Sequence, residues 1–304
     1  MNVNIVRFEQ CVSDEEKRGR VGVVIVNVFV WLVLIGFVIA SKGSVLFFIL
    51  PGILFNYLLA EYNVRKLEAV GATVTTQQFT PVHTAASDVC RRFGVREMPR
   101  IVVINSGESN AFALKFARKR VVMIFSELLD GIIDSPEQMR FLIAHEMCHG
   151  ALDHGPRGIF EIYKPARYRQ ARELTCDNAG LVAAGDLIES KTMLLKLCAG
   201  RRLFLNLSEN VLIAESQRIY SGFVGWLLRQ YLTHPPAGAR LENLSSFALT
   251  KGAALLSLPT SPVTAVSAPL LPSAFSTSSP TTALPEIPSV TNPSDSVKKS
   301  TPDW

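Results

Sequence analysis

The chain has 304 residues, of which 48% are apolar, and its 31 Lys and Arg residues against 26 Asp and Glu residues give a formal net charge of +5. A mean hydropathy of +0.24 excludes a disordered chain, and the length allows one or two domains with a sizeable core. Five widely spaced cysteines exclude a small disulfide-linked scaffold and indicate a reducing compartment. No basic run is interleaved with aromatic residues, so we expect no nucleic-acid partner.

Two uncharged apolar runs near the N-terminus predict membrane-spanning helices. Residues 21–40 contain no charge, and at about 1.5 Å per residue they span a hydrocarbon core of roughly 30 Å. Residues 44–60 form a second, shorter run with Pro51-Gly52, which a membrane helix tolerates with a kink. The alternatives are a buried helix of a soluble protein for either run, and a cleaved signal peptide for the first. A signal core has only about 7–15 apolar residues, which residues 21–40 exceed.

The charges around these runs predict the orientation of the helix pair. Two helices joined by a short turn form a hairpin, whose outer ends lie on the same side of the membrane. The turn carries one basic residue, Lys42. More basic residues flank the outer ends, at Arg7, Lys17, Arg18, Arg20, Arg65 and Lys66. By the positive-inside rule, we expect segment 1–20 and everything after residue 60 to lie in the cytoplasm, next to a bacterial inner membrane. The lipid bilayer is thus an expected partner.

Residues 61–255 mix charged and apolar positions and predict an α+β fold, mainly helical with a small β-sheet. Strands are expected at 72–79, 100–105 and 120–125, and the last two, with one segment between them, are expected to form a small sheet. Helices are expected at 81–93, 135–152, 168–205 and 211–232. The second helix begins with a capping signal, in which Ser135 is the N-cap, Pro136 starts the first turn and Gln138 completes a capping box.

The composition changes after residue 255. Residues 256–304 are rich in Pro, Ser and Thr and nearly free of aromatic residues until the last position. Such a segment cannot bury enough apolar surface to offset the entropy lost on ordering, so we expect a disordered tail. The predicted organisation is therefore an N-terminal segment (1–20), a membrane hairpin (21–60, with helices at 21–40 and 44–60), a globular domain (61–255) and the tail.

The sequence H-E-M-C-H at 145–149 is an H-E-x-x-H motif. His145 and His149 lie four residues apart on a predicted helix, so they point the same way and can bind one zinc ion. Glu146 lies next to the first histidine and can take a proton from a zinc-activated water. The alternative is a helix that carries two surface histidines without a metal.

A third ligand is expected downstream, because catalytic zinc has three protein ligands and one open position. Glu173 and Asp177 lie four residues apart and share one face of a predicted helix. Glu173 can ligate zinc, and Asp177 can accept the second ring N–H of a liganding histidine. The alternatives are a solvated helix face for this pair, and ligation by the thiolates of Cys148 or Cys176, which flank the predicted ligands.

Four motifs in this order resemble the HtpX-like family of zinc metallopeptidases, to which the CAAX prenyl proteases also belong. They are N-A-F-A at 110–113, H-E-M-C-H at 145–149, R-E-L-T-C-D at 172–177 and T-H-P-P at 233–236. The resemblance covers roughly residues 20–245, and an N-terminal membrane hairpin is common in that family. Two features depart from its pattern. HtpX has two further membrane helices between the H-E-x-x-H helix and the third ligand, for which this chain has no room, and the Pro-, Ser- and Thr-rich tail is not part of the pattern.

The resemblance implies a role for individual residues. One Zn²⁺ ion per chain would be held by His145, His149 and Glu173, with Glu146 as the general base. An edge strand lining the substrate groove would contain or adjoin Asn110, Ala111, Phe112 and Ala113. Asp177 would support a ligand, His234 would lie near the metal and aid the oxyanion, and Arg240 would hold a loop or a carboxylate near the site.

These observations predict a membrane-anchored zinc endopeptidase with a cytoplasmic catalytic domain. The resemblance implies protein or peptide substrates, such as misfolded or membrane proteins. One alternative is a zinc-binding but catalytically inactive membrane scaffold, against which the intact Glu146 argues, because a structural site needs no base. Another is a membrane-anchored interaction protein that recruits partners through its tail. The sequence does not define the oligomeric state.

Overall fold

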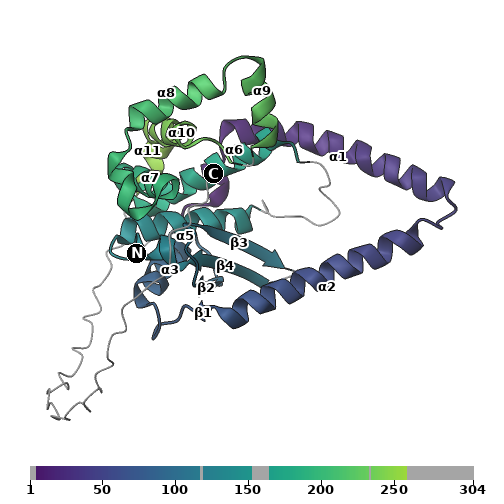
Figure 1. Ribbon diagram of the computed structural model, residues 1–304, viewed down its shortest axis with the longest axis horizontal. Coiled ribbons are helices and arrows are strands. Elements are labelled where there is room, and N and C mark those ends of the chain that lie inside the picture. The colour runs from purple at the N-terminus through teal and green to yellow at the C-terminus, as the bar shows by residue number, and fades with distance from the viewer. Residues whose placement is uncertain (1–4, 117–118, 153–163, 233, 259–304) are drawn as a thin grey trace, which may run out of the picture. The chain divides into compact units, whose positions relative to one another are not determined.

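The computed structural model of the chain describes residues 5–116, 119–152, 164–232 and 234–258. Within these ranges the fold is mainly helical with one small sheet, as the sequence predicts (Figure 1). The described residues all fall within one compact unit. The strands are β1 (Ala72–Thr73), β2 (Arg100–Ile104), β3 (Ala111–Phe116) and β4 (Lys119–Phe125). The helices are the 3₁₀ turns η1 (Phe8–Cys11) and η3 (Phe204–Asn206), and α1 (Asp14–Ala40), α2 (Leu46–Val70), α3 (Thr80–Arg92), α4 (Ser126–Asp130), α5 (Pro136–Ala151), α6 (Ala166–Ala184), α7 (Leu187–Leu203), α8 (Glu209–Ile219), α9 (Gly222–Tyr231), α10 (Ala237–Leu249) and α11 (Lys251–Leu256).

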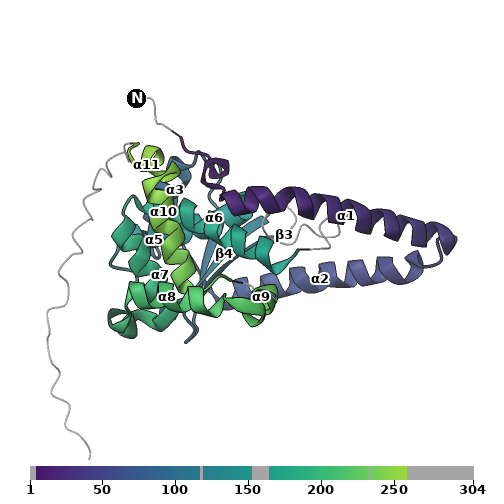
Figure 2. The ribbon, with the colours of Figure 1, turned by 90° about the horizontal axis from the view of Figure 1, so that it is seen from above.

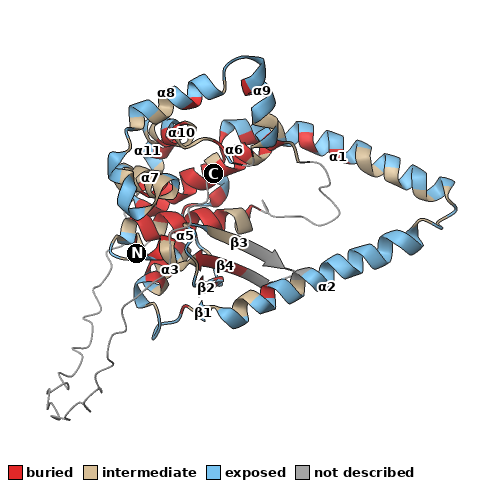
Figure 3. Ribbon diagram, viewed as in Figure 1, coloured by how far each residue is buried: buried red, intermediate tan, exposed pale blue. Residues whose placement is uncertain are grey.

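Helices α1 and α2 are long and apolar enough to cross a membrane, by length and composition alone. They meet at the turn between them, at the end remote from the rest of the fold (Figure 2). Their side chains are exposed along most of both helices (Figure 3). Helix α1 begins at Asp14, seven residues before the uncharged run at Val21, because the Ser13 hydroxyl accepts the N–H of Glu16 and caps the helix.

Helix α2 continues ten residues past the end of its apolar run at residue 60 and joins the sheet. Val64, in this extension, packs against Val102 of β2 and Val121 and Met123 of β4 in a small buried cluster. Burial of these side chains on the outer face of the sheet explains why the helix does not end where the apolar run does. The second candidate span is therefore continuous with the globular fold, without an intervening linker.

The sheet has the strand order β1-β2-β4-β3, so β3 lies at one edge. Strands β2 and β4 are parallel, and β3 and β1 pair with them in antiparallel fashion. The register places Phe112 opposite Met123. The predicted strand at 72–79 is much shorter than expected. The N–H of Thr75 donates to the carbonyl of Gln78 and the N–H of Gln78 donates to the carbonyl of Thr75, so the chain turns after Thr73. Edge strand β3 lies between the runs at 100–105 and 120–125, where the family resemblance implies an edge strand.

Helices α5 and α6 form the centre of the helical layer. Both are buried on nearly all sides, which is the pattern of a core helix rather than of a surface helix. Gly180 of α6 allows them to approach closely, since a Cβ atom there would lie 2.8 Å from the ring of Phe141 of α5. This close packing sets the distance between the two motifs that the sequence analysis selected.

Two predicted helices are each divided in the structure. The segment 168–205 contains α6 and α7, because Gly185 adopts a left-handed conformation with φ of 74° and ends α6. The segment 211–232 contains α8 and α9, which are separated before Gly222, whose φ is 66°. Helix α10 follows the T-H-P-P motif, a part of the chain for which the sequence patterns above predict no helix.

The end of the globular fold lies slightly later than the predicted boundary at residue 255. The Arg92 guanidinium donates hydrogen bonds to the carbonyl oxygens of Leu255 and Leu258, at 2.7 and 3.0 Å. Leu256 also packs against the core. The first three residues of the predicted tail therefore contact the fold, while residues 259–304, and with them the prediction of disorder, lie outside the described residues.

Candidate metal centre

Helix α5 places the two histidines of the H-E-x-x-H motif on one face. The Ser135 hydroxyl accepts the N–H of Gln138, as predicted, with Pro136 at the first helical position. The Gln138 side chain does not complete the capping box, because it binds Glu189 instead, at 2.6 Å. The helix continues without a break to Ala151, and the Nε2 atoms of His145 and His149 lie 3.2 Å apart.

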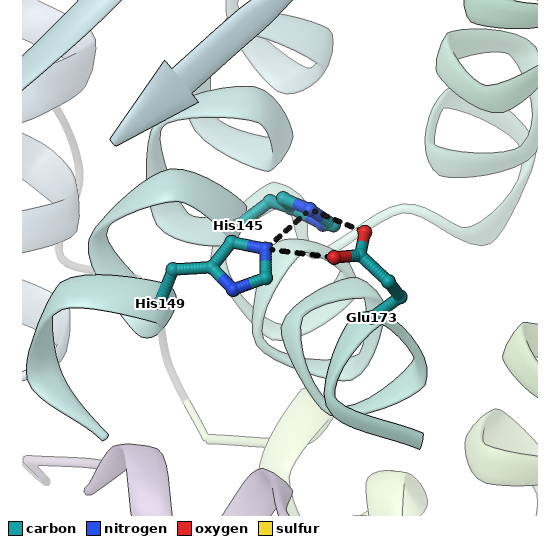
Figure 4. A group of neighbouring side chains, drawn as sticks. All are labelled: His145, His149 and Glu173. Carbon is teal, nitrogen blue, oxygen red and sulfur yellow. Dashed lines mark hydrogen bonds and ion pairs between the residues drawn. The ribbon is translucent and has the colours of Figure 1, made fainter. Parts of the chain in front are cut away.

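Helix α6 brings Glu173 to the same point (Figure 4). Its two carboxylate oxygens lie 3.5 Å from Nε2 of His145 and 3.4 Å from Nε2 of His149. Ligands bound tetrahedrally at about 2.0–2.1 Å from zinc lie about 3.3–3.4 Å from one another. The three spacings match that value, and two imidazoles with a carboxylate are a usual donor set for zinc. Among the described residues, this is the group of His, Cys, Asp and Glu side chains that can hold a metal ion.

A buried ion pair supports the first histidine. The Nδ1–H group of His145 donates to the Asp177 carboxylate at 3.0 Å, which leaves the Nε2 lone pair directed toward Glu173 and His149. The Arg240 guanidinium donates two hydrogen bonds to the same carboxylate, at 2.6 and 2.8 Å. Burial alone raises the pKa of Asp177, but Arg240 and His145 outweigh it and hold the pKa below its ordinary value. The carboxylate thus stays ionised and orients the ring.

Glu146 lies beside the metal-binding group without belonging to it. Its side chain is buried, and the backbone N–H of Ala113 in β3 hydrogen-bonds to its carboxylate. Burial raises the pKa of Glu146 to about 7, with a smaller contribution from the negative charge of Glu173. A carboxylate with such a pKa can both accept and return a proton near neutral pH.

These groups line a cleft of about 510 Å³ between the edge strand and α6. Its walls include all four residues selected for substrate binding: Asn110, Ala111, Phe112 and Ala113. The first precedes β3 and the other three lie within it, so the expected edge strand is present where the motif placed it. The cleft therefore joins an open strand edge to the metal-binding group and Glu146.

His234 and two of the cysteines occupy contrasting positions. The Nδ1 atom of His234 lies 3.0 Å from a carboxylate oxygen of Glu173, while most of its side chain is exposed at the cleft. Together with His145, it holds the pKa of Glu173 well below its ordinary value, against the opposing effect of burial, which is the largest contribution. Cys148 and Cys176 are fully buried in the hydrophobic core and lie outside the metal-binding group.

Three basic side chains of the cleft were not selected from the sequence: Lys164, Arg169 and Arg172. The position of one of them could have been predicted from the sequence, because Arg169 precedes Glu173 by four residues and therefore shares its face of α6. The cleft thus has a positively charged wall on the α6 side. Thr233 of the T-H-P-P motif lies outside the described residues.

The arrangement of two histidines and a glutamate, with a second glutamate beside an edge strand, defines the class of the metallopeptidases. Residues 76–164, which include the H-E-x-x-H helix, match the model of peptidase family M48. This finding confirms, at the level of the family, the resemblance that the four motifs indicated. The match ends at Lys164, before the third ligand on α6.

One relative has a name of the same class. The chain is 25% identical over 218 residues to the plastoglobule-localized metallopeptidase 48, chloroplastic, of Arabidopsis thaliana. The aligned region is 61% of this chain and 62% of that protein, so the chain spans less than two thirds of its relative. No solved structure is significantly similar to the chain.

Proposed function

We propose that the protein is a membrane-anchored, zinc-dependent endopeptidase. One observation carries the proposal: Nε2 of His145, Nε2 of His149 and the carboxylate of Glu173 have the mutual spacing of zinc ligands, and Glu146 lies beside them in an open cleft. Zinc held by these three residues would supply a Lewis acid that polarises a peptide carbonyl and lowers the pKa of water. The family M48 domain supports the coarser assignment, a metallopeptidase.

Glu146 is the proposed general base. Its carboxylate faces the cleft, where it can take a proton from the attacking water and later give that proton to the leaving amine. Its hydrogen bond from the N–H of Ala113 fixes the carboxylate next to the strand that would bind the substrate. In the same proposal Asp177 holds the ring of His145, and His234 aids the oxyanion from the mouth of the cleft, where it contacts Glu173.

The edge strand β3 is the proposed substrate-binding element. A peptide in extended conformation can add to an open strand edge through backbone hydrogen bonds, with little dependence on its side chains. Asn110 to Ala113 line the cleft, so a peptide bound along them would pass in front of Glu146 and the zinc ligands. This mode of binding suits unfolded segments, and we propose misfolded or membrane proteins as substrates.

The proposed anchor is the hairpin of α1 and α2, with the catalytic domain in the cytoplasm of a bacterial cell. The segment before α1 packs on α6: the N–H of Ser13 donates to the Thr175 hydroxyl at 3.0 Å, and the Asn178 amide donates to the carbonyl of Cys11 at 3.0 Å. The chain on both sides of the hairpin therefore belongs to one fold. Both ends of the hairpin must then lie on one side of the membrane, which agrees with the distribution of basic residues.

The test is a comparison of Glu146→Gln with the parent in zinc content and in cleavage of an unfolded protein such as casein. Glutamine has nearly the same shape but cannot accept the proton, so we expect about one zinc per chain and at least a 100-fold loss of activity. Glu137→Gln, on the first turn of the same helix, is a matched control and should keep both. Near-normal cleavage by the zinc-loaded Glu146→Gln variant would falsify the mechanism. A parent that holds zinc but cleaves no unfolded protein would favour the inactive scaffold.

A further inference from the structure

A second cavity lies on the face of α6 that is turned away from the catalytic cleft. It has a volume of about 840 Å³ and is bounded by the beginning of α1 together with α6, α8, α9 and α10. Tyr168, Ala171 and Leu174 of α6 line this cavity, whereas Arg172 and Glu173 line the cleft. At 100° per residue Ala171 lies about 160° from Glu173 around the helix, so the cavity is on the other side of α6 from the metal-binding group and has no part in the proposed chemistry.

Three arginines from three different helices line the cavity: Arg18 of α1, Arg167 of α6 and Arg229 of α9. The Nε atom of Arg229 is buried and has no hydrogen-bond partner, while its guanidinium lies 4.0 Å above the ring of Tyr220. A buried donor without a partner costs free energy, so this group indicates an absent acceptor.

Within the part of the chain that the structure describes, none of the three arginines forms an ion pair. Two carboxylates, Glu15 and Glu242, also line the cavity but pair with none of the arginines. The arginine side chains are therefore available to an anion, and a planar guanidinium matches the geometry of phosphate oxygens.

The cavity lies at the level where α1 becomes apolar. The ring of Tyr168 packs against Gly19 so closely that a Cβ atom there would lie 2.9 Å from it. Arg18 precedes the uncharged run at Val21 by three residues, or about 4.5 Å along the helix axis. Each headgroup layer of a bilayer is about 5–8 Å thick, so with α1 inserted from Val21 the cavity faces the lipid headgroups.

Helix α9 presents an apolar face beside the same cavity. Phe223 and Val224 are 74% and 76% exposed, and Trp226 stacks on Phe223 with ring centroids 5.8 Å apart. Arg229 lies on the opposite face of this helix, toward the cavity. Gln170 of α6 donates hydrogen bonds to the carbonyls of Arg229 and Leu232, which fixes the end of α9 against α6. Apolar and aromatic side chains on one face with arginine on the other are typical of helices that lie in a membrane surface.

We propose that this cavity binds the phosphate-bearing headgroup of an anionic membrane lipid. The headgroup lies among Arg18, Arg167 and Arg229, and the acyl chains run along the exposed faces of α1 and α9. A lipid is favoured over a free phosphate ion because the arginines line one cavity that both α1 and α9 border, and both helices carry exposed apolar side chains. The site would hold the domain against the membrane surface in addition to the hairpin, and it does not depend on peptidase activity.

The test uses the full-length protein in phosphatidylcholine nanodiscs, with a fixed small fraction of brominated phosphatidylglycerol or brominated phosphatidylcholine. Bromine quenches nearby tryptophan fluorescence. The variant Trp31→Phe/Trp304→Phe leaves Trp226 on α9 as the reporter, and Trp226→Phe/Trp304→Phe leaves Trp31 within α1. We expect brominated phosphatidylglycerol to quench Trp226 more strongly than brominated phosphatidylcholine, while Trp31 is quenched equally by both.

Substitution of the cavity arginines should remove this preference. In the Trp226 reporter, Arg229→Gln should reduce the preference for phosphatidylglycerol about five-fold, the effect of one arginine at an anionic surface. Arg18 is exposed, so Arg18→Gln gives the same test without a change in the packed interior. Arg202→Gln, an exposed arginine outside the cavity, is the control and should keep the preference.

Each other outcome overturns one defined part of the argument. Equal quenching of Trp226 by both lipids, or an unchanged preference in both arginine variants, refutes the anionic headgroup site. Loss of the preference when millimolar inorganic phosphate is added assigns the cavity to a free phosphate and refutes the lipid. Absence of quenching at Trp31 shows that the hairpin is not inserted, which refutes the membrane anchor of the proposed function.

Discussion

The substitution Arg240→Met removes the cation behind the metal-binding group and should destabilise the whole fold. In the structure, the Asp177 carboxylate is fully buried and receives two hydrogen bonds from Arg240 and one from His145. Methionine fills much of the same space but donates none of these bonds. The carboxylate then keeps a buried negative charge with the imidazole as its remaining partner among the contacts described here.

The expected loss can be estimated from the burial of the pair. Removal of one partner of a buried ion pair costs about 3–5 kcal/mol, because the remaining charge is left without compensation. For a domain of 150–250 residues, each 1 kcal/mol corresponds to about 2–4 °C in Tm. We therefore expect Arg240→Met to lower the Tm of the purified protein by about 6–20 °C. The exposed Arg202→Met is the matched control and should change the Tm by no more than about 2 °C.

A double variant separates the loss of charge balance from a general packing defect. Asp177→Asn/Arg240→Met removes both charges, and the asparagine oxygen can still accept the Nδ1–H of His145. It should be more stable than Arg240→Met alone, with a coupling of about 1–3 kcal/mol between the two positions. Thermal unfolding of the three variants in one detergent, with the metal removed, makes the comparison. A Tm loss below about 3 °C in Arg240→Met, or a double variant no more stable than this single one, would refute the reasoning.

Three further predictions address the metal, the helix packing and the end of the fold. Glu173→Ala removes one of three proposed ligands, so zinc at low free zinc should fall well below one per chain by elemental analysis; full occupancy would mean that the third ligand lies elsewhere. Gly180→Ala forces a Cβ atom against Phe141 and should cost about 1–3 kcal/mol in denaturant unfolding, whereas Gly52→Ala, with nothing near its Cβ position, should change stability little. Truncation after Leu258 should leave the Tm unchanged. Truncation after Gly252 removes two acceptors of the Arg92 guanidinium and should lower the free energy of unfolding by about 1–3 kcal/mol. Equal Tm values for the two truncated proteins would show that the last helix contributes nothing to stability.

The metal-binding group could be predicted because its geometry is mostly local. Once 135–152 is a helix, the four-residue spacing alone puts His145 and His149 on one face, and a helical 173–177 puts Glu173 and Asp177 on another. The packing of α5 against α6 could not be predicted from local residue spacing. It depends on close packing at Gly180, whose significance appears only when Phe141 lies opposite.

The partners of the ligands were harder to predict, since they come from distant parts of the chain. Arg240 lies 63 residues from Asp177, and no local pattern connects the two. The helix ends were missed for a different reason. Gly185 and Gly222 adopt positive φ values that end or begin helices, but a single glycine in an otherwise helical pattern is also tolerated inside a helix.

The extension of α2 onto the sheet has a consequence for the reach of the enzyme. With the bilayer boundary near residue 60, Val64 touches the sheet about 6 Å beyond it, and α2 ends at Val70, about 15 Å beyond it. With that boundary, the rigid helix α2 holds the sheet, and with it edge strand β3, at a fixed and short distance from the bilayer. An extended peptide covers about 3.3 Å per residue, so a membrane-rooted substrate needs only about two to five residues to climb that far. Cuts in such substrates would fall in their juxtamembrane segments, at a spacing set by the length of a helix rather than by the sequence being cut.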